Sequence, residues 1–204
     1  MEREFVAWPK TYRLFTGKGI VVTEKIDGTN ACVVFDENGE MFAQSRNRII
    51  TPESDNADFA AWAHENREEL FSVLGPGRHY GEWWGQKIGR TYGADRKIFS
   101  LFNVRKFYQG SDLDPLDSPS TRAFLSSLDP VLTAVPVLYE GPFSEEEIRL
   151  AAGRLRRDGS VAALLSLGKE DVPAEGVCIF FPDTGVVMKH VFDFDDKPKW
   201  RAMQ

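Results

Sequence analysis

Two common means of holding a nucleotide or a metal are missing from this sequence. It has neither a GxxxxGK(S/T) phosphate loop nor a glycine-rich dinucleotide fingerprint after its first apolar strand. Its two cysteines, Cys32 and Cys178, lie far apart within apolar runs, and its three histidines do not have the spacing of metal ligands. These absences exclude a CxxC-type zinc site and predict two buried free thiols, as suits a reducing cytoplasm. Any nucleotide chemistry must therefore depend on other residues.

Long apolar runs are missing too. No stretch approaches the roughly 18 residues that a membrane span needs, and the opening residues MEREFVAWPK have no apolar core of a signal peptide. With 204 residues, of which 42% are hydrophobic, the chain can bury the core of one ordinary domain. We expect a cytoplasmic monomer that consists of a single domain over residues 1–204 and does not contact membranes.

Positive charge is scarce overall but locally dense. The chain has 25 Lys and Arg against 31 Asp and Glu, and this net charge of −6 argues against nucleic-acid binding by general electrostatics. Between Lys87 and Lys106, however, there are six cations and one anion, Asp95, with aromatic residues among them. Basic and aromatic residues interleave in this way where single strands or phosphates bind. A solvated basic face has the same composition, so both interpretations stay open at this point.

Short apolar runs typical of strands dominate the chain. We expect strands over residues 19–26, 30–36, 40–45, 79–84, 97–104, 134–140, 176–181 and 185–192. Apolar residues at helical spacing predict helices over 55–74 and 120–128. A third helix should begin at the capping box formed by Ser144 and Glu147 and end at Gly159. Hairpin-joined strands with helices inserted between them predict an α+β domain rather than a βαβ succession.

The stretch VVTEKIDGTNACVVF, residues 21–35, has an unusual concentration of charge at a turn. Apolar runs around Asp27-Gly28 predict a hairpin, but a turn does not need a lysine, Lys25, between two carboxylates. A lysine acts as a nucleophile only when neutral, which burial and nearby cations favour and carboxylates oppose. Adjacent strand residues point to opposite faces, so Glu24 need not touch the Lys25 amine. The alternative is an ordinary surface hairpin with salt-bridging charges.

Four later stretches place polar residues at or inside apolar strands. SRNR (45–48) offers guanidinium groups for phosphate, and YGEWWGQ (80–86) sets Glu82 at a strand end. AEGVCIFF (174–181) begins with Glu175 beside its apolar run, and VVMKHVF (186–192) holds Lys189 within one. Taken singly, each residue also fits a simpler role: Glu82 as a carboxylate at the rim of a hairpin, Glu175 as a loop residue, and Lys189 as an edge-strand lysine that blocks aggregation. Together they predict one polar pocket between sheets.

In this order, the five stretches resemble the motifs of the covalent nucleotidyltransferase superfamily, and most closely those of the ATP-dependent RNA ligase family. EKIDGTN (24–30) resembles the family's nucleophile motif, KxDG followed by Thr or Ser and then Asn. The resemblance extends from about Phe5 to the end of the chain. It implies an α+β nucleotidyltransferase (ligase adenylation) domain, in which two mainly antiparallel β-sheets enclose a nucleotide pocket with flanking helices. It also implies that no C-terminal accessory domain is present.

The resemblance further implies a role for each matching residue. Lys25 would attack the α-phosphorus of ATP and hold AMP, and Lys189 would meet the α-phosphate as a second catalytic and nucleotide-binding residue. The other nucleotide-binding residues would be Glu24 near the adenine, Asn30, Arg46 on ribose or phosphate, Glu82 on the ribose hydroxyls, and Phe102 against the base. Glu175 would help to organise Mg²⁺ or Mn²⁺. The residues expected to hold RNA beside the pocket are Lys87, Arg90, Arg96 and Lys97.

Two positions depart from the family pattern. Val187 stands where the fifth motif usually has the first of two lysines, and Asn103 stands where an aspartate is usual; Lys197 and Lys199 are candidates for the missing charge. The leading hypothesis is an ATP-dependent RNA ligase that acts on RNA 5′-phosphate and 3′-hydroxyl ends, with an accessory protein as a candidate partner. The alternatives are a degenerate nucleotide- or RNA-binding module without turnover and a GTP-using guanylyltransferase of the capping type.

Overall fold

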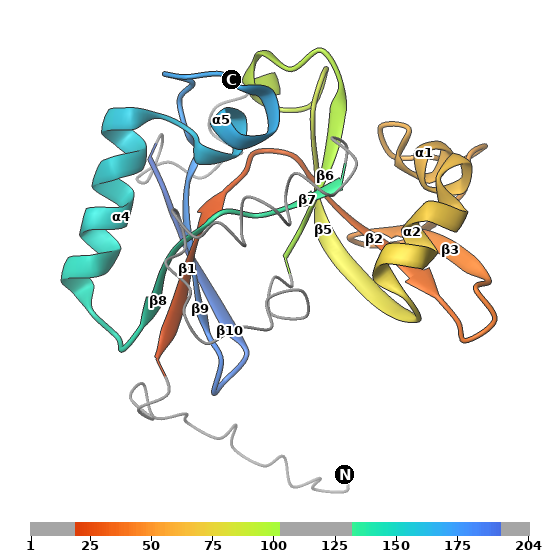
Figure 1. Ribbon diagram of the computed structural model, residues 1–204, viewed down its shortest axis with the longest axis horizontal. Coiled ribbons are helices and arrows are strands. Elements are labelled where there is room, and N and C mark those ends of the chain that lie inside the picture. The colour runs from red at the N-terminus through yellow and green to blue at the C-terminus, as the bar shows by residue number, and fades with distance from the viewer. Residues whose placement is uncertain (1–18, 103–131, 193–204) are drawn as a thin grey trace, which may run out of the picture.

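The strands of the protein form two sheets in the computed structural model, which describes residues 19–102 and 132–192 (Figure 1). The four-stranded sheet has the order β10 (Val186–Val191), β9 (Gly176–Phe181), β1 (Ile20–Lys25), β8 (Val137–Gly141). The six-stranded sheet has the order β4 (Ile49–Ile50), β3 (Met41–Ser45), β2 (Thr29–Phe35), β5 (Gly77–Gly85), β6 (Lys97–Leu101), β7 (Leu132–Ala134). Of these strand pairs only β6–β7 is parallel. The predicted α+β class with two mainly antiparallel sheets is therefore confirmed.

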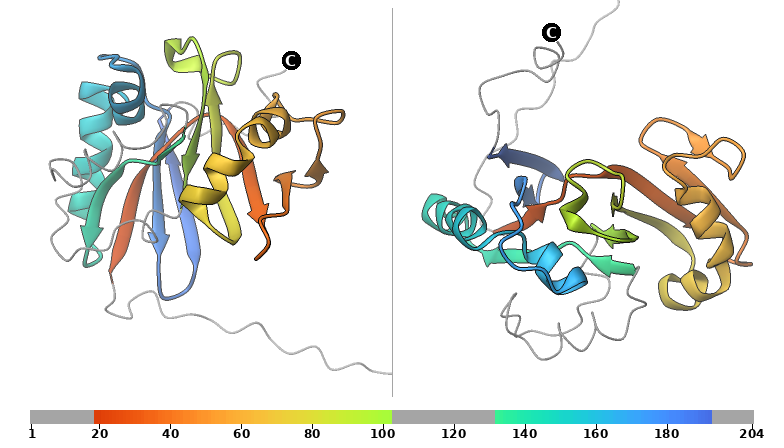
Figure 2. Two further views of the ribbon diagram at one scale, coloured as in Figure 1. Left: turned by 45° about the vertical axis from the view of Figure 1, so that its right-hand side comes forward. Right: turned by 90° about the horizontal axis from the view of Figure 1, so that it is seen from above.

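Helices cover the outer face of each sheet. The described helices are α1 (Phe59–Glu65), α2 (Arg67–Leu74), α4 (Glu145–Asp158), α5 (Val161–Leu167) and the 3-10 helix η1 (Thr91–Gly93). Helices α1 and α2 lie on the six-stranded sheet and α4 lies on the four-stranded sheet, as the two views in Figure 2 show. None of these helices is long and apolar enough to cross a membrane.

The apolar core consists of three clusters that follow the period of the strands. Alternate residues of β2, including Ala31 and Val33, pack against α1 and α2. Alternate residues of β1, Ile20 and Val22, pack against α4. The third cluster, which includes Trp84, joins the β1–β2 connection to β5, β6 and α5. The third cluster therefore holds the two sheets together at the point where the chain passes from one to the other.

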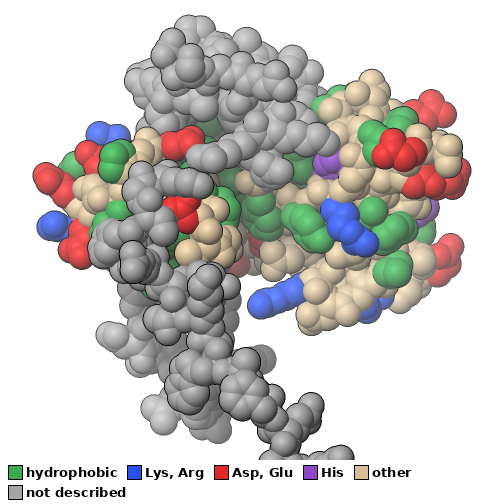
Figure 3. Space-filling model, turned by 90° about the horizontal axis from the view of Figure 1, so that it is seen from below, with side chains coloured by type: hydrophobic (Ala, Val, Ile, Leu, Met, Phe, Trp, Pro, Cys, Tyr) green, Lys and Arg blue, Asp and Glu red, His purple; other side chains and the backbone are tan. Residues whose placement is uncertain are grey.

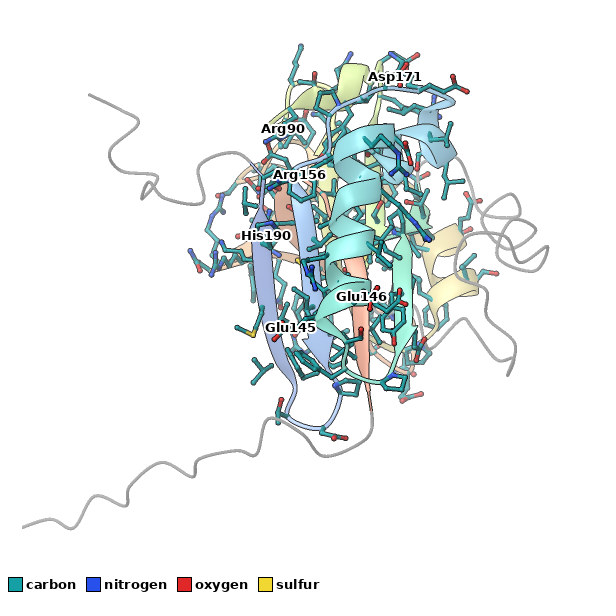
Figure 4. The ribbon with its side chains drawn as sticks, turned by 90° about the vertical axis from the view of Figure 1, so that its left-hand side faces the viewer. Arg90, Glu145, Glu146, Arg156, Asp171 and His190 are labelled. Atoms are coloured by element: carbon teal, nitrogen blue, oxygen red, sulfur yellow. The ribbon has the colours of Figure 1, made fainter. Side chains whose placement is uncertain are left out.

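Helix α4 has the start and stop signals expected from its sequence. The Ser144 hydroxyl accepts a hydrogen bond from the Glu147 amide at 3.2 Å, and the helix ends at Gly159, which has a φ of 83°. Acidic residues occupy the first turn and basic residues the last, which favours the helix dipole. Figure 4 shows Glu145 and Glu146 at one end of α4 and Arg156 at the other.

The helix predicted over 55–74 is wrong in its boundaries. The chain forms two helices that meet at Asn66, whose φ of −105° and ψ of 19° are not helical. Asp55 lies outside the helix, and its carboxylate accepts the amides of Ala60 at 2.8 Å and Ala61 at 2.9 Å. These bonds satisfy amides that have no intrahelical partner at the helix start.

The strand predicted over 134–140 is in fact two strands in different sheets. β7 pairs with β6, and β8 pairs with β1. The change occurs at Val135–Pro136, because the Val135 amide bonds to the six-stranded sheet through Leu101 O, at 3.0 Å. Proline has no amide to donate, and Pro136 O instead accepts the Glu24 amide at 2.9 Å. The helix predicted over 120–128 lies outside the described residues.

Candidate active site

The crossing from β1 to β2 brings the predicted site residues together. Strand pairing sets Lys25 opposite Gly176, the residue that follows Glu175. On the other sheet it sets Asn30 opposite Glu82. These register positions place both carboxylates and the lysine around the turn at residues 26–28. Four predicted residues from three distant stretches of sequence thus meet at one junction.

The turn has room only for glycine at position 28. A Cβ on Gly28 would lie 2.5 Å from Trp83 O and 2.8 Å from Trp84 Cβ. Contacts this short would force the turn away from β5. Gly28 therefore allows the β1–β2 turn to lie directly against the strand that holds Glu82.

Lys25 forms an ion pair in the site. Its Nζ donates a hydrogen bond to Glu175 Oε2. The Lys25 side chain is partly exposed, whereas that of Glu175 is buried. A reactant can therefore approach this ion pair from the side of the lysine, whereas the carboxylate is enclosed by the protein.

Glu82 shares this charged environment. Burial raises the pKa of Glu82 to about 7, while the Lys25 charge acts in the opposite direction. The charges of Glu175 and Asp27 raise the pKa further, and the Gly28 amide lowers it by hydrogen bonding. These interactions show that three carboxylates and one ammonium lie close together at the junction.

Asp27 ties the turn to the segment after β5. The Arg90 amide donates to Asp27 Oδ2 at 3.2 Å, and Arg90 Nε lies 3.7 Å from the same oxygen. The Asp27 amide donates to Tyr92 Oη at 2.8 Å. A Cβ at Gly89 would lie 2.8 Å from the Asp27 carboxyl carbon, so the carboxylate sits directly on this backbone. Asp27 therefore fixes the position of the turn, a role that the sequence prediction did not assign.

Glu24 points to the opposite side of β1 from Lys25. Its side chain is only 1% exposed. Glu24 Oε1 accepts the Ser160 hydroxyl at 2.5 Å, and Oε2 accepts the Ala162 amide at 2.8 Å. Burial raises the pKa of Glu24 to about 7, against the lowering effect of these hydrogen bonds. A contact between Glu24 and adenine stays a prediction, and the engagement of this carboxylate with α5 does not favour it.

Lys189 lies on the same face of the four-stranded sheet as Lys25. Strand pairing aligns Lys189, Cys178 and Thr23 across β10, β9 and β1, and Thr23 and Lys25 share a face because they are two residues apart. Lys189 is exposed. Burial raises the pKa of the Cys178 thiol, and both lysines lower it. The two predicted lysines are therefore near neighbours of the Cys178 thiol. The prediction of two buried free thiols is correct for Cys32 and wrong for Cys178, which is only partly buried.

The six-stranded sheet contributes the other predicted nucleotide-binding residues. Asn30 and Glu82 are opposite one another, and the Phe102 amide donates to Tyr80 O at 2.9 Å, continuing the register of β5 and β6. Phe102 and Arg46 are both exposed. Asn30, Glu82 and Phe102 therefore share one face, and Arg46 lies in the turn that follows β3. Asn103, the departure from the family pattern, is outside the described residues, as are Lys197 and Lys199.

Charges of the predicted RNA-binding segment are largely engaged within the protein. Arg96 Nη2 donates to Ser166 O at 2.9 Å, at the end of α5. Lys97 Nζ donates to Ala57 O at 3.1 Å and to the Asp58 carboxylate. Arg90 lies beside Asp27, as described above, whereas Lys87 is exposed. An RNA-binding role for these four residues stays a prediction.

The carboxylates at the junction fit a metal ion that is held mainly by a substrate. No group of three or more His, Cys, Asp or Glu among residues 19–102 and 132–192 has the arrangement of a metal site. Mg²⁺ usually binds one or two carboxylates together with water and substrate phosphates. Glu175, with one oxygen on Lys25, meets that smaller requirement. The metal-binding role of Glu175 stays a prediction.

The sequence prediction missed two residues that support the site. Ser160 was not recognised, although it precedes a short apolar run that ends at Gly168, a pattern typical of a helix cap. Tyr92 was counted only among the aromatic residues of the basic segment. Its hydroxyl accepts the Asp27 amide, a contact across 65 positions that no local pattern indicates.

Comparisons with known proteins agree with this geometry. A family model described as RNA ligase matches residues 18–191, and no curated protein matches the chain significantly. Solved structures of a Naegleria gruberi RNA ligase have the same fold. An apo lysine-to-alanine variant has 22% identity and a TM-score of 0.53, covering 86% of this chain and 50% of that one.

Two further variants of that ligase are similar in the same way. One, solved with ATP and Mn, has 21% identity and a TM-score of 0.53, covering 86% of this chain and 49% of its own. The other, solved with AMP and Mn, has 21% identity and a TM-score of 0.52, covering 86% and 50%. This chain thus spans about half the length of these structures, and at such identity the likeness shows the fold alone. Because the family model covers most of its length, the chain belongs to the RNA ligase family.

Proposed function

We propose that the protein is an ATP-dependent RNA ligase. It adenylylates itself at Lys25, transfers AMP to an RNA 5′-phosphate and joins that end to a 3′-hydroxyl. The observation that supports this most is the junction itself, where Lys25 contacts Glu175 beside Glu82. The family membership of the chain gives this arrangement its chemical meaning.

The first step requires a neutral amine at Lys25. A bond forms between Nζ and the α-phosphorus, the bond to pyrophosphate breaks, and the amine loses a proton. Glu175 is the hydrogen-bond partner of Nζ and is therefore the first group able to receive that proton. The ion pair must open before the attack. A divalent ion bound with ATP would be held by Glu175 and would neutralise charge on the phosphates.

The remaining residues bind and orient the nucleotide. Lys189, on the same face as Lys25, places a positive charge where the α-phosphate lies during displacement. Glu82 and Asn30, paired across two strands, hold the ribose side of the nucleotide. Phe102 stacks near the base, and Arg46 contacts ribose or phosphate. Because the transition state of phosphoryl transfer needs charge stabilisation more than proton transfer, these contacts supply most of the catalysis.

A second candidate is a binding module that has lost turnover. Val187 favours it, because this residue lies two positions from Lys189 on the same face, is exposed, and stands where the family usually has a lysine. Such a module would bind ATP without forming a covalent product. A capping-type guanylyltransferase would instead form that product with GTP.

Labelling with α-³²P-ATP separates these functions. The purified protein is incubated with labelled ATP or GTP and Mg²⁺ or Mn²⁺ and then run on a denaturing gel. We expect label from ATP only, and its loss in Lys25→Ala but not in Lys169→Ala, a lysine outside the junction. Absence of label from a folded protein that still binds ATP would contradict the proposal and support the binding module. Joining of RNA ends by the labelled protein tests the later steps.

A further inference from the structure

Exposed aromatic side chains gather on one face of the six-stranded sheet. Phe42 is 36% exposed, Tyr80 48% and Phe102 42%. Phe42 and Tyr80 pair with even-numbered residues of β2, and Phe102 lies opposite Tyr80. All three therefore lie on the face opposite α1 and α2, because the odd-numbered residues of β2 pack against the helices. Aromatic rings left in solvent on a sheet face are typical of a binding surface rather than of a core.

An arginine lies among these rings. The guanidinium of Arg78 is 5.7 Å from the centre of the Phe42 ring, and its Nη1 donates to Gln44 Oε1 at 2.8 Å. Val34 pairs with both Phe42 and Arg78, and Cys32 pairs with both Gln44 and Tyr80. We call Phe42, Gln44, Arg78 and Tyr80 the aromatic–arginine face. Figure 3 shows basic side chains among hydrophobic ones on the half of the molecule that contains β3 and β5.

This face is continuous with the proposed nucleotide site. Arg78, Tyr80 and Glu82 are successive residues on the same face of β5. The four positions from Glu82 to Arg78 span about 14 Å along the strand. A ligand that leaves the junction along the sheet would therefore cross Tyr80 before reaching Arg78 and Phe42.

We propose that the aromatic–arginine face binds an unpaired segment of the RNA substrate next to the joined ends. The inference rests on the proposed function, which makes RNA the substrate. Bases of a single strand stack on exposed aromatic rings, and an arginine beside them contacts phosphate or stacks on a base. Paired bases are already stacked on one another and offer no free faces to Tyr80 or Phe42. The face therefore favours single-stranded over double-stranded RNA.

The positive charge of this face is better placed for RNA than that of the basic segment. Arg96 and Lys97 already bind backbone oxygens or a carboxylate of the protein. Arg78, by contrast, binds a neutral amide, so its full charge remains to attract phosphate. Phosphate binding by one arginine does not conflict with a net charge of −6, because stacking supplies the rest of the affinity.

Fluorescence anisotropy with a short labelled single-stranded RNA tests the proposal. At fixed salt, we expect Tyr80→Ala, Phe42→Ala and Arg78→Ala each to raise the Kd by about fivefold or more. Tyr80→Phe should retain most of the affinity, because stacking needs the ring and not the hydroxyl. Arg149→Ala and Leu150→Ala change similarly exposed residues of α4 and should leave the Kd within twofold. The same RNA annealed to its complement should bind more weakly to the unsubstituted protein.

Labelling with ATP distinguishes failure of this inference from failure of the proposed function. Phe42→Ala and Arg78→Ala should label with ATP as well as the unsubstituted protein, because that step involves no RNA. Unchanged RNA affinity in all three alanine variants would overturn the inference and leave a protein partner as the occupant of the face. Loss of labelling together with RNA binding would also overturn it, since the face would then serve the nucleotide site. Absence of labelling in every protein would instead contradict the proposed function.

Discussion

Glu24 and Glu82 are two buried carboxylates with different surroundings. Burial raises the pKa of each to about 7. The carboxylate of Glu24 accepts hydrogen bonds from Ser160 and Ala162, on the side of β1 that faces α5. Glu82 lies at the junction, where its charge interacts with Lys25, Glu175 and Asp27. One carboxylate is enclosed by neutral donors of the fold, and the other belongs to a cluster of charges.

The comparison shows that a raised pKa does not by itself identify a catalytic group. Desolvation acts in the same way on a structural and on a functional carboxylate. The two carboxylates differ in whether their partners keep their positions and charges during the proposed reaction. The oxygens of Glu24 are occupied by donors that keep their positions, whereas Glu82 faces an ammonium that the proposed reaction must discharge. Substituting each residue should therefore affect different properties.

The largest effect should be the loss of stability in Glu24→Ala. The substitution leaves the Ser160 hydroxyl and the Ala162 amide unsatisfied in a buried position, together with a cavity. We expect the free energy of unfolding to fall by about 3 kcal/mol. Urea denaturation monitored by tryptophan fluorescence measures it, with Glu37→Ala in an exposed turn as the control. A loss no greater than that of the control would show that the contact with α5 contributes little.

Stability should also depend on pH through both carboxylates. The folded-state pKa of about 7 lies above the ordinary value of 4.5 for each group, so the folded state binds more protons than the unfolded state between these values. Stability is therefore highest below about pH 4.5 as far as these groups are concerned, and falls as the pH rises through 7. Each group should contribute a decrease of about 3 kcal/mol.

Denaturation at a series of pH values tests this dependence. Glu82→Gln, which cannot ionise, should remove about half of the decrease between pH 5 and pH 8, because two such groups contribute to it. Equal slopes for the variant and the unsubstituted protein would contradict the assignment of a raised pKa to Glu82. The variant keeps Glu24 and its hydrogen bonds, so the decrease that remains serves as the internal control.

Glu82→Gln should impair labelling more than folding. The variant keeps the shape of the side chain and removes a buried charge, so the free energy of unfolding at neutral pH should not decrease. The rate of labelling by ATP should fall by about tenfold, which corresponds to about 1.4 kcal/mol, because the amide cannot replace a carboxylate toward the ribose and Lys25. Single-turnover labelling at saturating ATP separates a slower reaction from weaker binding. Glu37→Gln, the same substitution at an exposed turn outside the junction, is the control.

Local patterns predicted those parts of the fold that depend on neighbours in sequence. The cap at Ser144 was correct, since cap residues act within a few positions. The hairpin predicted at Asp27-Gly28 is wrong, because the chain turns there from one sheet to the other and β1 does not pair with β2. The break at Asn66 was missed, because apolar spacing continues across it. So was the exchange of sheets at Pro136, where an apolar run typical of one strand belongs to two.

The candidate site was predicted by its residue types and not by its contacts. Strand pairing brings together Lys25, Glu82, Glu175 and Lys189, as expected from apolar strands with charged residues at or inside them. The hydroxyl partner of Glu24, Ser160, is 136 positions away in sequence, and it caps α5, a largely apolar helix of only seven residues. Adjacent strand positions point in opposite directions, so Glu24 and Lys25 belong to different environments although they are consecutive.

The smallest effect should come from Tyr92→Phe, which changes the junction without altering its charge. The Tyr92 hydroxyl accepts the Asp27 amide at 2.8 Å, and the ring packs in the cluster that joins the two sheets. Removing the hydroxyl leaves the packing intact, so the free energy of unfolding should fall by only about 1 kcal/mol. Because the Arg90 amide and guanidinium would still hold the Asp27 carboxylate, labelling should slow by less than the tenfold loss expected for Glu82→Gln. A greater slowing in Tyr92→Phe than in Glu82→Gln would show that the position of the turn, rather than the charge of Glu82, limits the attack by Lys25.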